Sequence, residues 1–214
     1  MTKIAIISER DNVWALPVWK KTIPILQKNG MDIVGIWVCP AKLGKLSGIN
    51  IPKWYFNTFG ILDFTRLSLF SLFSQLRRWL RKFKRNGISN FSSLAKHYGI
   101  DYHECEDPNS SNLVTKLKST QVEILITWVG YIFKKQVLEV PRTGSINKHA
   151  SLLPSYQGLF PYLWAYVEDA PQGVSFHAMT ENIDGGDILL QHDAPKSIVE
   201  SSMVRFYLYV YDHF

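Results

Sequence analysis

The sequence predicts an α/β fold, with a mostly parallel, twisted sheet flanked by helices. Short runs rich in Val, Ile and Trp alternate along the chain with longer segments of helical periodicity. The first 40 residues already follow this order, with an apolar run at 4–7, a helical pattern over 13–28 and a second apolar run at 32–38. Strands that alternate with helices favour a parallel sheet, because each helix carries the chain back over one face of the sheet.

The remaining elements are predicted from the same periodicities. We expect a loop over 40–60, where Pro and Gly recur, and then a long amphipathic helix that ends near Asn86-Gly87. Shorter helices are expected over 91–98, 111–119 and 134–138, and strands over 101–105, 123–129 and 144–149.

Length and composition are those of an ordinary globular domain. The chain has 214 residues, 46% hydrophobic and 20% charged, which suits one domain over 1–195 with a C-terminal segment at 196–214. That segment is apolar and aromatic, so it is either a dimer-forming surface or the start of a truncated region. Cys39 and Cys105 lack metal-ligand spacing, and the N-terminal apolar run is too short for a signal peptide or a membrane span. We therefore expect reduced thiols and a cytoplasmic location.

The positive charge is concentrated in one segment. The chain has a formal charge of +6, and residues 61–90 hold seven Lys and Arg against Asp63, so the rest is neutral on balance. Three interpretations remain for this basic amphipathic helix, which we place at 60–86. Its apolar stripe packs on the domain or on a partner chain, or residues 66–85 contact an anionic membrane surface, or its cations hold substrate phosphates. No nucleic-acid recognition motif accompanies it, so no nucleic acid is expected as a partner.

A group of polar residues near one strand end indicates chemistry. Asn147 and His149 are two residues apart on a strand, so they project to the same face, with Lys148 on the other. Ligands bind at the carboxyl ends of strands in such sheets. Asp184 lies in a Gly-flanked loop that is free to approach, and a carboxylate favours the protonated form of an imidazole beside it.

These three side chains suit the transfer of an acyl group to an amine. Asn147 and a protonated His149 would donate hydrogen bonds to the oxyanion, and Asp184 would accept the proton that the amine loses. The reaction needs neither a metal nor a nucleophilic side chain. Each residue also has a structural interpretation, since His149 can cap a turn, Asn147 can bond to the backbone and Asp-Gly favours turns. His177 is expected to be a supporting or core residue rather than a metal ligand.

The stretch from Gly130 to Gln191 resembles the folate-dependent formyltransferases, a family that includes enzymes acting on methionyl-tRNA, on glycinamide ribonucleotide and on nucleotide-linked sugars. Order and spacing both agree over about sixty residues. The matching residues are Gly130-Tyr131-Ile132, Val137 to Arg142, Asn147 to Pro154, Gly158, Pro161, Trp164-Ala165, Gly173-Val174, His177 to Met179, Ile183 to Ile188 and Gln191.

The resemblance implies a Rossmann-like formyltransferase catalytic domain, in which the family's catalytic Asn, His and Asp fall on Asn147, His149 and Asp184. It implies formyl-tetrahydrofolate as the donor and no metal. The family's pterin pocket would correspond here to Gly130, Tyr131, Ile132 and Phe133, and to the loop before Asp184. The residues that we expect to bind the donor are Gly130, Tyr131, Ile132, Phe133, Leu153 and Ile183.

Among the family's members, the sequence is most similar in kind to the nucleotide-sugar N-formyltransferases, which act on amino sugars destined for surface polysaccharide such as lipopolysaccharide O-antigen. Residues 8–12 lack the glycines of a phosphate loop, and the chain ends too early for the further C-terminal barrel of a methionyl-tRNA formyltransferase. Arg10, Tyr156 and Gln157 are candidates for binding the amino sugar, although Gln157 stands where the family usually has Arg. A homodimer is expected. The alternatives are a different acceptor amine, transfer of the formyl group to water, or a membrane-associated module with an inactive core.

Overall fold

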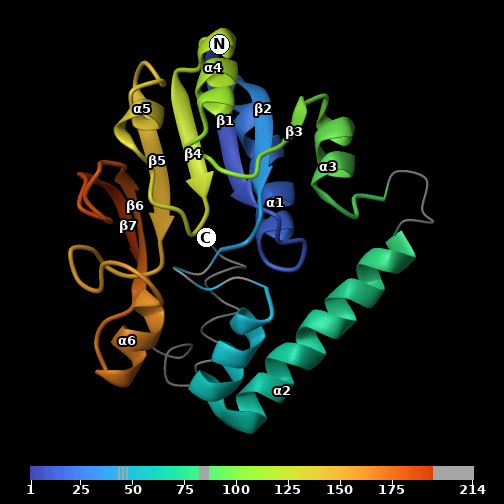
Figure 1. Cartoon of the computed structure of the whole chain (residues 1–214), viewed down its shortest axis with the longest axis vertical. Helices are drawn as coiled ribbons and strands as arrows, with labels where there is room; N and C mark the ends of the chain where they lie inside the picture. Colours follow the sequence, from blue (N-terminus) through green and yellow to red (C-terminus); the bar gives the residue numbers. More distant parts are fainter. Residues whose placement is uncertain (43, 45, 47, 82–86, 195–214) are drawn as a thin grey trace.

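The computed structural model describes residues 1–194, except for 43, 45, 47 and 82–86. A seven-stranded sheet has the order β3-β2-β1-β4-β5-β6-β7, and its first five members are parallel (Figure 1). The elements are β1 (Thr2–Glu9), α1 (Ala15–Lys28), β2 (Met31–Cys39), α2 (Asn50–Arg81), α3 (Phe91–Tyr98), β3 (Tyr102–Glu104), α4 (Ser111–Thr120), β4 (Ile124–Trp128), α5 (Lys135–Leu138), β5 (Gly144–His149), α6 (Pro161–Val167), β6 (Gly173–Ala178) and β7 (Ile188–Asp193).

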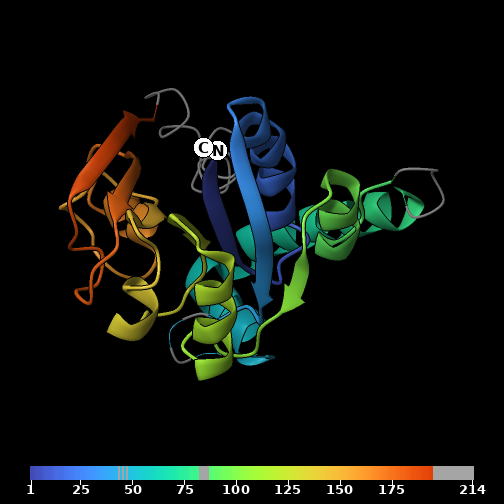
Figure 2. The same ribbon diagram turned by 90° about the horizontal axis from the view of Figure 1, so that it is seen from above.

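The central strand β1 shows why the sheet needs helices on both faces. Ile4 and Ile6 belong to one buried cluster with residues of α1 and α3, whereas Ala5 and Ile7 belong to another with residues of α4 and α5. Because successive side chains point to opposite faces, an unbroken apolar run buries both faces at once. Figure 2 shows α1 and α3 on one side of the sheet and α4 and α5 on the other. The predicted α/β fold with a mostly parallel sheet is confirmed.

Local signals set several helix boundaries as the sequence predicts. Helix α3 starts at a capping box, in which the Ser93 N–H donates to Asn90 Oδ1 at 2.8 Å and the Asn90 N–H donates to Ser93 Oγ at 3.0 Å. It ends at Gly99, which has a φ of 68°, a conformation that costs glycine little. The predicted range 91–98 is therefore confirmed, because both ends are encoded by local hydrogen-bonding residues.

The loop predicted over 40–60 is partly wrong, because α2 begins at Asn50. A kink at Gly60, where φ is 71° and ψ is 176°, divides α2 into two helical parts. The first part is held by aromatic contacts that the sequence does not reveal. Trp54 stacks on Phe160 with ring centroids 4.1 Å apart, and Tyr55 stacks on Phe59 at 5.4 Å. Tyr55, Phe59 and Phe160 belong to a third apolar cluster.

The end of the sheet beyond β5 was not predicted as secondary structure. Strands β6 and β7 are antiparallel to their neighbours, and α6 precedes them. Every residue of β7 is exposed, so the strand lacks the alternating burial that makes an edge strand recognisable. The antiparallel register places His177 directly opposite Asn147, which becomes important at the candidate site.

The second part of α2 runs outward below the carboxyl ends of the strands (Figure 1). Its apolar stripe does not pack on the domain, because Leu69, Leu72, Leu76 and Leu80 are all about half exposed or more. The interpretation that the stripe covers the domain is therefore wrong for the described residues. The predicted C-terminal end of this helix and the segment 196–214 lie outside the described residues. In the part of the chain that the structure describes, no helix has both the length and the apolar character of a membrane span.

Both cysteines are buried and free. Cys39 ends β2 and Cys105 follows β3, and their thiol groups are hydrogen-bonded to each other. Because β2 and β3 are parallel neighbours, their carboxyl ends lie together.

The apolar clusters on the two faces of the sheet lead to a prediction about stability. Leu117 of α4 is fully buried against the sheet, so Leu117→Ala should lower the free energy of unfolding by about 2–5 kcal/mol through lost burial and a residual cavity. Leu72→Ala, at a side chain that is 61% exposed, is the matched control and should change it by less than about 0.5 kcal/mol. Urea unfolding measures both. Equal losses in the two variants would contradict this description of the core.

Candidate active site

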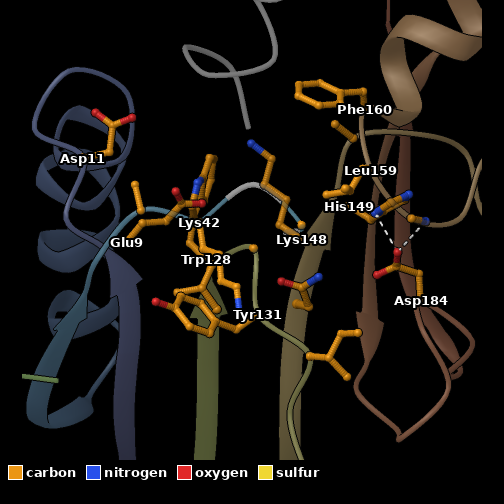
Figure 3. A pocket seen from close by; sticks show the side chains of 18 of the residues that line it. Glu9, Asp11, Lys42, Trp128, Tyr131, Lys148, His149, Leu159, Phe160 and Asp184 are labelled. Atoms are coloured by element: carbon orange, nitrogen blue, oxygen red, sulfur yellow. Dashed lines mark hydrogen bonds and ion pairs between the residues drawn. The ribbon is translucent and has the colours of Figure 1, made fainter. Parts of the chain in front are cut away.

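A cavity of about 800 Å³ lies at the carboxyl ends of β1, β4 and β5. It is bounded by the loop between β6 and β7 and by the side of α2 that carries Leu67 and Ser71. Asn147, His149, His177 and Asp184 all line it. Figure 3 shows His149 and Asp184 on one side of this space, with Glu9 and Asp11 on the opposite side. The carboxyl edge is where open α/β sheets bind ligands, as expected from the sequence.

Asp184 holds the polar side of the cavity together. Its Oδ2 lies 3.4 Å from His149 Nδ1 and accepts a hydrogen bond of 2.9 Å from the Gly158 N–H. Its Oδ1 lies 3.4 Å from His177 Nε2. The carboxylate is 13% exposed, and the imidazoles of His149 and His177 are 6% and 2% exposed. The structure therefore brings His149 and Asp184 together as predicted, and it adds His177 as a second imidazole.

Asn147 is held in one orientation by two neighbours. Its Oδ1 accepts a hydrogen bond of 3.1 Å from Thr127 Oγ1, so its Nδ2 is the donor group. That nitrogen lies 3.4 Å from His177 Nε2. A donor amide that is fixed before a ligand arrives needs no reorganisation when negative charge develops beside it.

In each imidazole, the ring nitrogen that points away from Asp184 is hydrogen-bonded to a backbone carbonyl group. His149 Nε2 donates to Tyr156 O at 2.8 Å, and His177 Nδ1 donates to Ala178 O at 2.9 Å. While the rings are neutral, their inner nitrogens therefore carry no proton and face Asp184 as acceptors. No proton then lies between Asp184 and either imidazole. If one imidazole takes up a proton on the nitrogen that faces Asp184, that contact becomes a charge-assisted hydrogen bond.

Burial governs the charge of this cluster. It lowers the pKa of His149, and the nearby charge of Asp184 offsets only part of that effect. Burial also acts to raise the pKa of Asp184, but interactions with His177, His149 and the Gly158 N–H outweigh it, so this pKa is lowered. Burial therefore disfavours the protonated His149 that was expected from the sequence. An ionised Asp184 beside a neutral His149 would act as a base rather than an acid.

Two glycines allow the backbone to approach the site closely. A Cβ on Gly186 would lie 1.9 Å from Ala178 O, so only glycine lets the loop that carries Asp184 pass the end of β6. A Cβ on Gly130 would lie 2.1 Å from Lys42 O, where the segment after β2 crosses the segment after β4. These contacts explain physically why the residues that match the family include glycine at 130 and 186.

Most of the residues predicted to bind the donor line the cavity. Gly130, Tyr131, Ile132, Phe133 and Ile183 are all on its wall. Leu153 does not line it. Leu153 is buried, and its backbone N–H donates to Ser175 Oγ at 3.0 Å, so it anchors the turn that follows β5.

The three residues predicted to bind the acceptor do not line the cavity. Arg10 is on the surface and pairs with Glu104 at 3.2 Å. The hydroxyl group of Tyr156 donates to Glu168 at 2.7 Å, while its carbonyl holds His149. Gln157 Nε2 donates to Asp184 O at 3.2 Å, so it supports the loop that carries Asp184 from outside the cavity. Tyr156 and Gln157 thus position the cluster in this structure.

The sequence missed several charged residues of the cavity, among them Lys148, Glu9 and Asp11. Lys148, expected on the other face of the strand, also lines it, and its Nζ lies 4.0 Å from the centroid of the Trp128 ring. Burial lowers the pKa of Lys148 to about 7. On the opposite wall, burial and the nearby Asp11 raise the pKa of Glu9 to about 8, and burial raises that of Asp11. The cavity lies beyond the strand ends, so residues from both faces of the sheet reach it (Figure 3).

Comparison with protein families identifies the class to which this fold and site belong. The family model described as "Formyl transferase" matches residues 69–205, which is more than half of the chain. The protein therefore belongs to the formyl transferase family, as the resemblance indicated. Among the described residues, no group of three or more His, Cys, Asp or Glu side chains is arranged to hold a metal ion.

Curated relatives include methionyl-tRNA formyltransferases from several organisms. That of Thermodesulfovibrio yellowstonii is 37% identical over 102 residues, which cover 47% of this chain and 33% of the relative. That of Clostridioides difficile is 32% identical over 110 residues, which cover 50% of this chain and 36% of the relative. The chain thus spans about a third of the length of these relatives.

Solved structures with the same fold differ in their named activities. A phosphoribosylglycinamide formyltransferase from Streptococcus pneumoniae has a TM-score of 0.56 at 14% identity, covering 99% of this chain and 93% of its own. A sugar N-formyltransferase from Shewanella sp. has a TM-score of 0.53 at 16% identity, and the match covers 99% of this chain and 69% of that protein. A formyltetrahydrofolate deformylase from Pseudomonas syringae has a TM-score of 0.62 at 15% identity, and the match covers 99% of this chain and 56% of that protein. At these identities the likeness shows the fold alone.

The raised pKa of Glu9 predicts how stability depends on pH. Between its ordinary value of 4.5 and about 8, folded Glu9 keeps a proton that the unfolded chain has lost, so stability falls as pH rises. Glu9→Gln removes this dependence and should raise the free energy of unfolding at pH 8 by at least about 1 kcal/mol relative to the parent. Urea unfolding across this range measures the effect. The exposed Glu106→Gln is the control, and parallel pH curves for parent and Glu9→Gln would contradict the prediction.

Proposed function

We propose that this protein transfers a formyl group from formyl-tetrahydrofolate to an amine, with Asn147, His149 and Asp184 as its catalytic residues. The observation that carries the proposal is the buried contact of 3.4 Å between His149 Nδ1 and Asp184 Oδ2, beside the fixed amide of Asn147. A formyl carbonyl in this cavity would meet a hydrogen-bond donor and a proton acceptor together. Family membership supports formyl transfer as the reaction.

The chemistry follows from the charge state of the cluster. The amine attacks the formyl carbon, a C–N bond forms, and the carbonyl oxygen becomes negative. Asn147 Nδ2 donates to that oxygen, a contact typically worth about 3–4 kcal/mol when it is preorganised. The attacking nitrogen gives its proton to the Asp184–His149 pair, which lacks one between its facing acceptors. The C–N bond to the folate then breaks, and the proton passes to the departing nitrogen.

The cavity has room and suitable walls for the donor. Its volume of about 800 Å³ is within the range of sites for sizeable organic ligands. Tyr131, Ile132 and Phe133 and the Ile183 side chain provide apolar contact next to the catalytic cluster. We propose these residues, with the backbone of Gly130, as the pterin subsite.

We propose a nucleotide-linked amino sugar as the acceptor. Glu9 and Asp11 offer carboxyl groups that suit the hydroxyl groups of a sugar, and a Glu9 that keeps its proton can both donate and accept such hydrogen bonds. Lys42 and Lys148 line other parts of the cavity and are the cations suited to the nucleotide phosphates. Such an acceptor would place the protein in the cytoplasm, on a route to surface polysaccharide. We also propose residues 1–195 as the catalytic domain.

Methionyl-tRNA is a second candidate acceptor, because the two curated relatives named above are methionyl-tRNA formyltransferases with 32–37% identity over the matched half of the chain. The catalytic cluster serves either acceptor, since it acts only on the amine and the formyl group. The two candidates differ in what surrounds the amine, so the choice between them is made by assay.

Removal of the catalytic groups should abolish most activity. Asn147→Ala, His149→Ala and Asp184→Asn should each lower kcat by about 100-fold or more while the protein stays folded, because each removes stabilisation made in the transition state. Single-turnover release of tetrahydrofolate measures the rates, and circular dichroism checks the fold. His192→Ala is the control, at an exposed histidine outside the cavity. Near-parental turnover in any of the three variants would refute the role assigned to that residue.

The acceptor is decided by an assay with formyl-tetrahydrofolate and a panel of amines. We expect tetrahydrofolate release to require an amino sugar and to be at least about tenfold faster when the sugar carries a nucleotide diphosphate, because that group contributes binding energy. Methionyl-tRNA and water are the other arms of the assay. Faster transfer to methionyl-tRNA would overturn the sugar assignment, and release without any amine would indicate a hydrolase. No release with any acceptor would overturn formyl transfer itself.

A further inference from the structure

The second part of α2, residues 61–81, presents its apolar stripe away from the protein. Leu69, Leu72, Phe73, Leu76 and Leu80 recur at spacings of three and four residues, so they lie on one side of the helix. Their exposed fractions are 47–61%. The opposite side faces the domain, where Leu67 is 8% exposed and Ser68 and Ser71 line the cavity. This is the reverse of the usual arrangement, in which a helix turns its apolar side toward the core.

The exposed stripe is long and continuous. Residues 61–81 span about 30 Å at 1.5 Å per residue. Trp79 extends the stripe toward the end of the helix and is 54% exposed. A single exposed leucine needs no explanation, but a contiguous exposed stripe of this length marks an interaction surface.

The charges beside the stripe indicate what it contacts. Residues 61–81 contain four arginines and one acid, Asp63, which is already paired with Arg66 at 2.9 Å. Arg78 lies near Asp11 on the inner side of the helix, whereas Arg77 is exposed. A second copy of this helix would therefore bring basic surfaces together, with no acid of α2 left to offset them. An anionic lipid surface complements the arginines and accepts the apolar side chains together.

We infer that α2 docks this protein on an anionic membrane surface, with the Leu69–Leu80 stripe in the interface and the neighbouring arginines at the lipid head groups. Leucine, phenylalanine and tryptophan on one side with arginines beside them are the composition of helices that lie in the plane of a membrane. The inner side of the same helix lines the cavity. Docking therefore brings the cavity to within about one helix diameter, roughly 10 Å, of the lipid surface.

The first test is flotation with vesicles of phosphatidylcholine, with and without about one third phosphatidylglycerol. The parent protein should float with the anionic vesicles and not with pure phosphatidylcholine. Leu72→Gln/Leu76→Gln/Leu80→Gln should weaken binding by at least about 100-fold through loss of apolar contact, and it should fold normally because these side chains are exposed. Arg77→Gln/Arg81→Gln should weaken binding roughly 30-fold.

The matched control for charge is Lys116→Gln/Lys118→Gln on α4, which removes two positive charges from another exposed surface. It should bind anionic vesicles as the parent does. If it binds as weakly as the Arg77→Gln/Arg81→Gln variant, the attraction is due to overall charge, and the assignment to α2 is overturned.

The second test measures depth of insertion. Phosphatidylcholine with brominated acyl chains, mixed with phosphatidylglycerol, should quench the tryptophan fluorescence of the parent but not of Trp79→Phe. Parent protein that fails to bind anionic vesicles overturns the proposal. So does a parent that sediments as a dimer and becomes a monomer in the triple Leu→Gln variant, because the stripe would then be a contact between copies. Neither test uses formyl transfer, so their failure leaves the proposed function untouched.

Discussion

The candidate site depends on one carboxylate enclosed by two imidazoles. Asp184 is 13% exposed and faces His149 and His177 at equal distances of 3.4 Å. A buried carboxylate keeps its charge only if surrounding groups compensate for the water it has lost. Here the Gly158 N–H provides part of that compensation, and each imidazole adds to it when it holds a proton on the nitrogen that faces Asp184; burial lowers the pKa of His149. The result is a carboxylate–imidazole pair that can accept one proton.

The topology at the end of the sheet creates this arrangement. Asn147 and His149 come from the last parallel strand, and His177 comes from the first antiparallel one. The pairing of Asn147 with His177 across the β5–β6 ladder places the amide and the second imidazole side by side. The loop that follows β6 then returns Asp184 to the same point, past the close contact of Gly186 with the end of that strand. Strand pairing and one glycine thus assemble residues that are 37 positions apart in the chain.

Helix α2 connects the site to the surface of the molecule. Its inner side supplies Leu67 and Ser71 to the cavity, and its outer side carries the apolar stripe. The proposed membrane contact is therefore on the outer side of a helix whose inner side lines the cavity. An acceptor that is made or used at a lipid surface would reach the cavity beside the helix that docks there.

The sequence by itself determined the α/β plan, since the unbroken apolar runs at 4–7 and 32–38 bury both faces of their strands. It also determined the boundaries of α3, because local capping residues encode them. The contact between His149 and Asp184 was predictable as well, because both residues belong to a motif of fixed spacing. Only the tertiary structure decided that α2 begins at Asn50, that His177 joins Asp184 and that Lys148 reaches the cavity. It also decided that burial lowers the pKa of His149 and that the stripe of α2 faces outward. The physical reason is common to all five: burial, partner rings and strand register come from residues distant in the chain, and local periodicity carries no information about them.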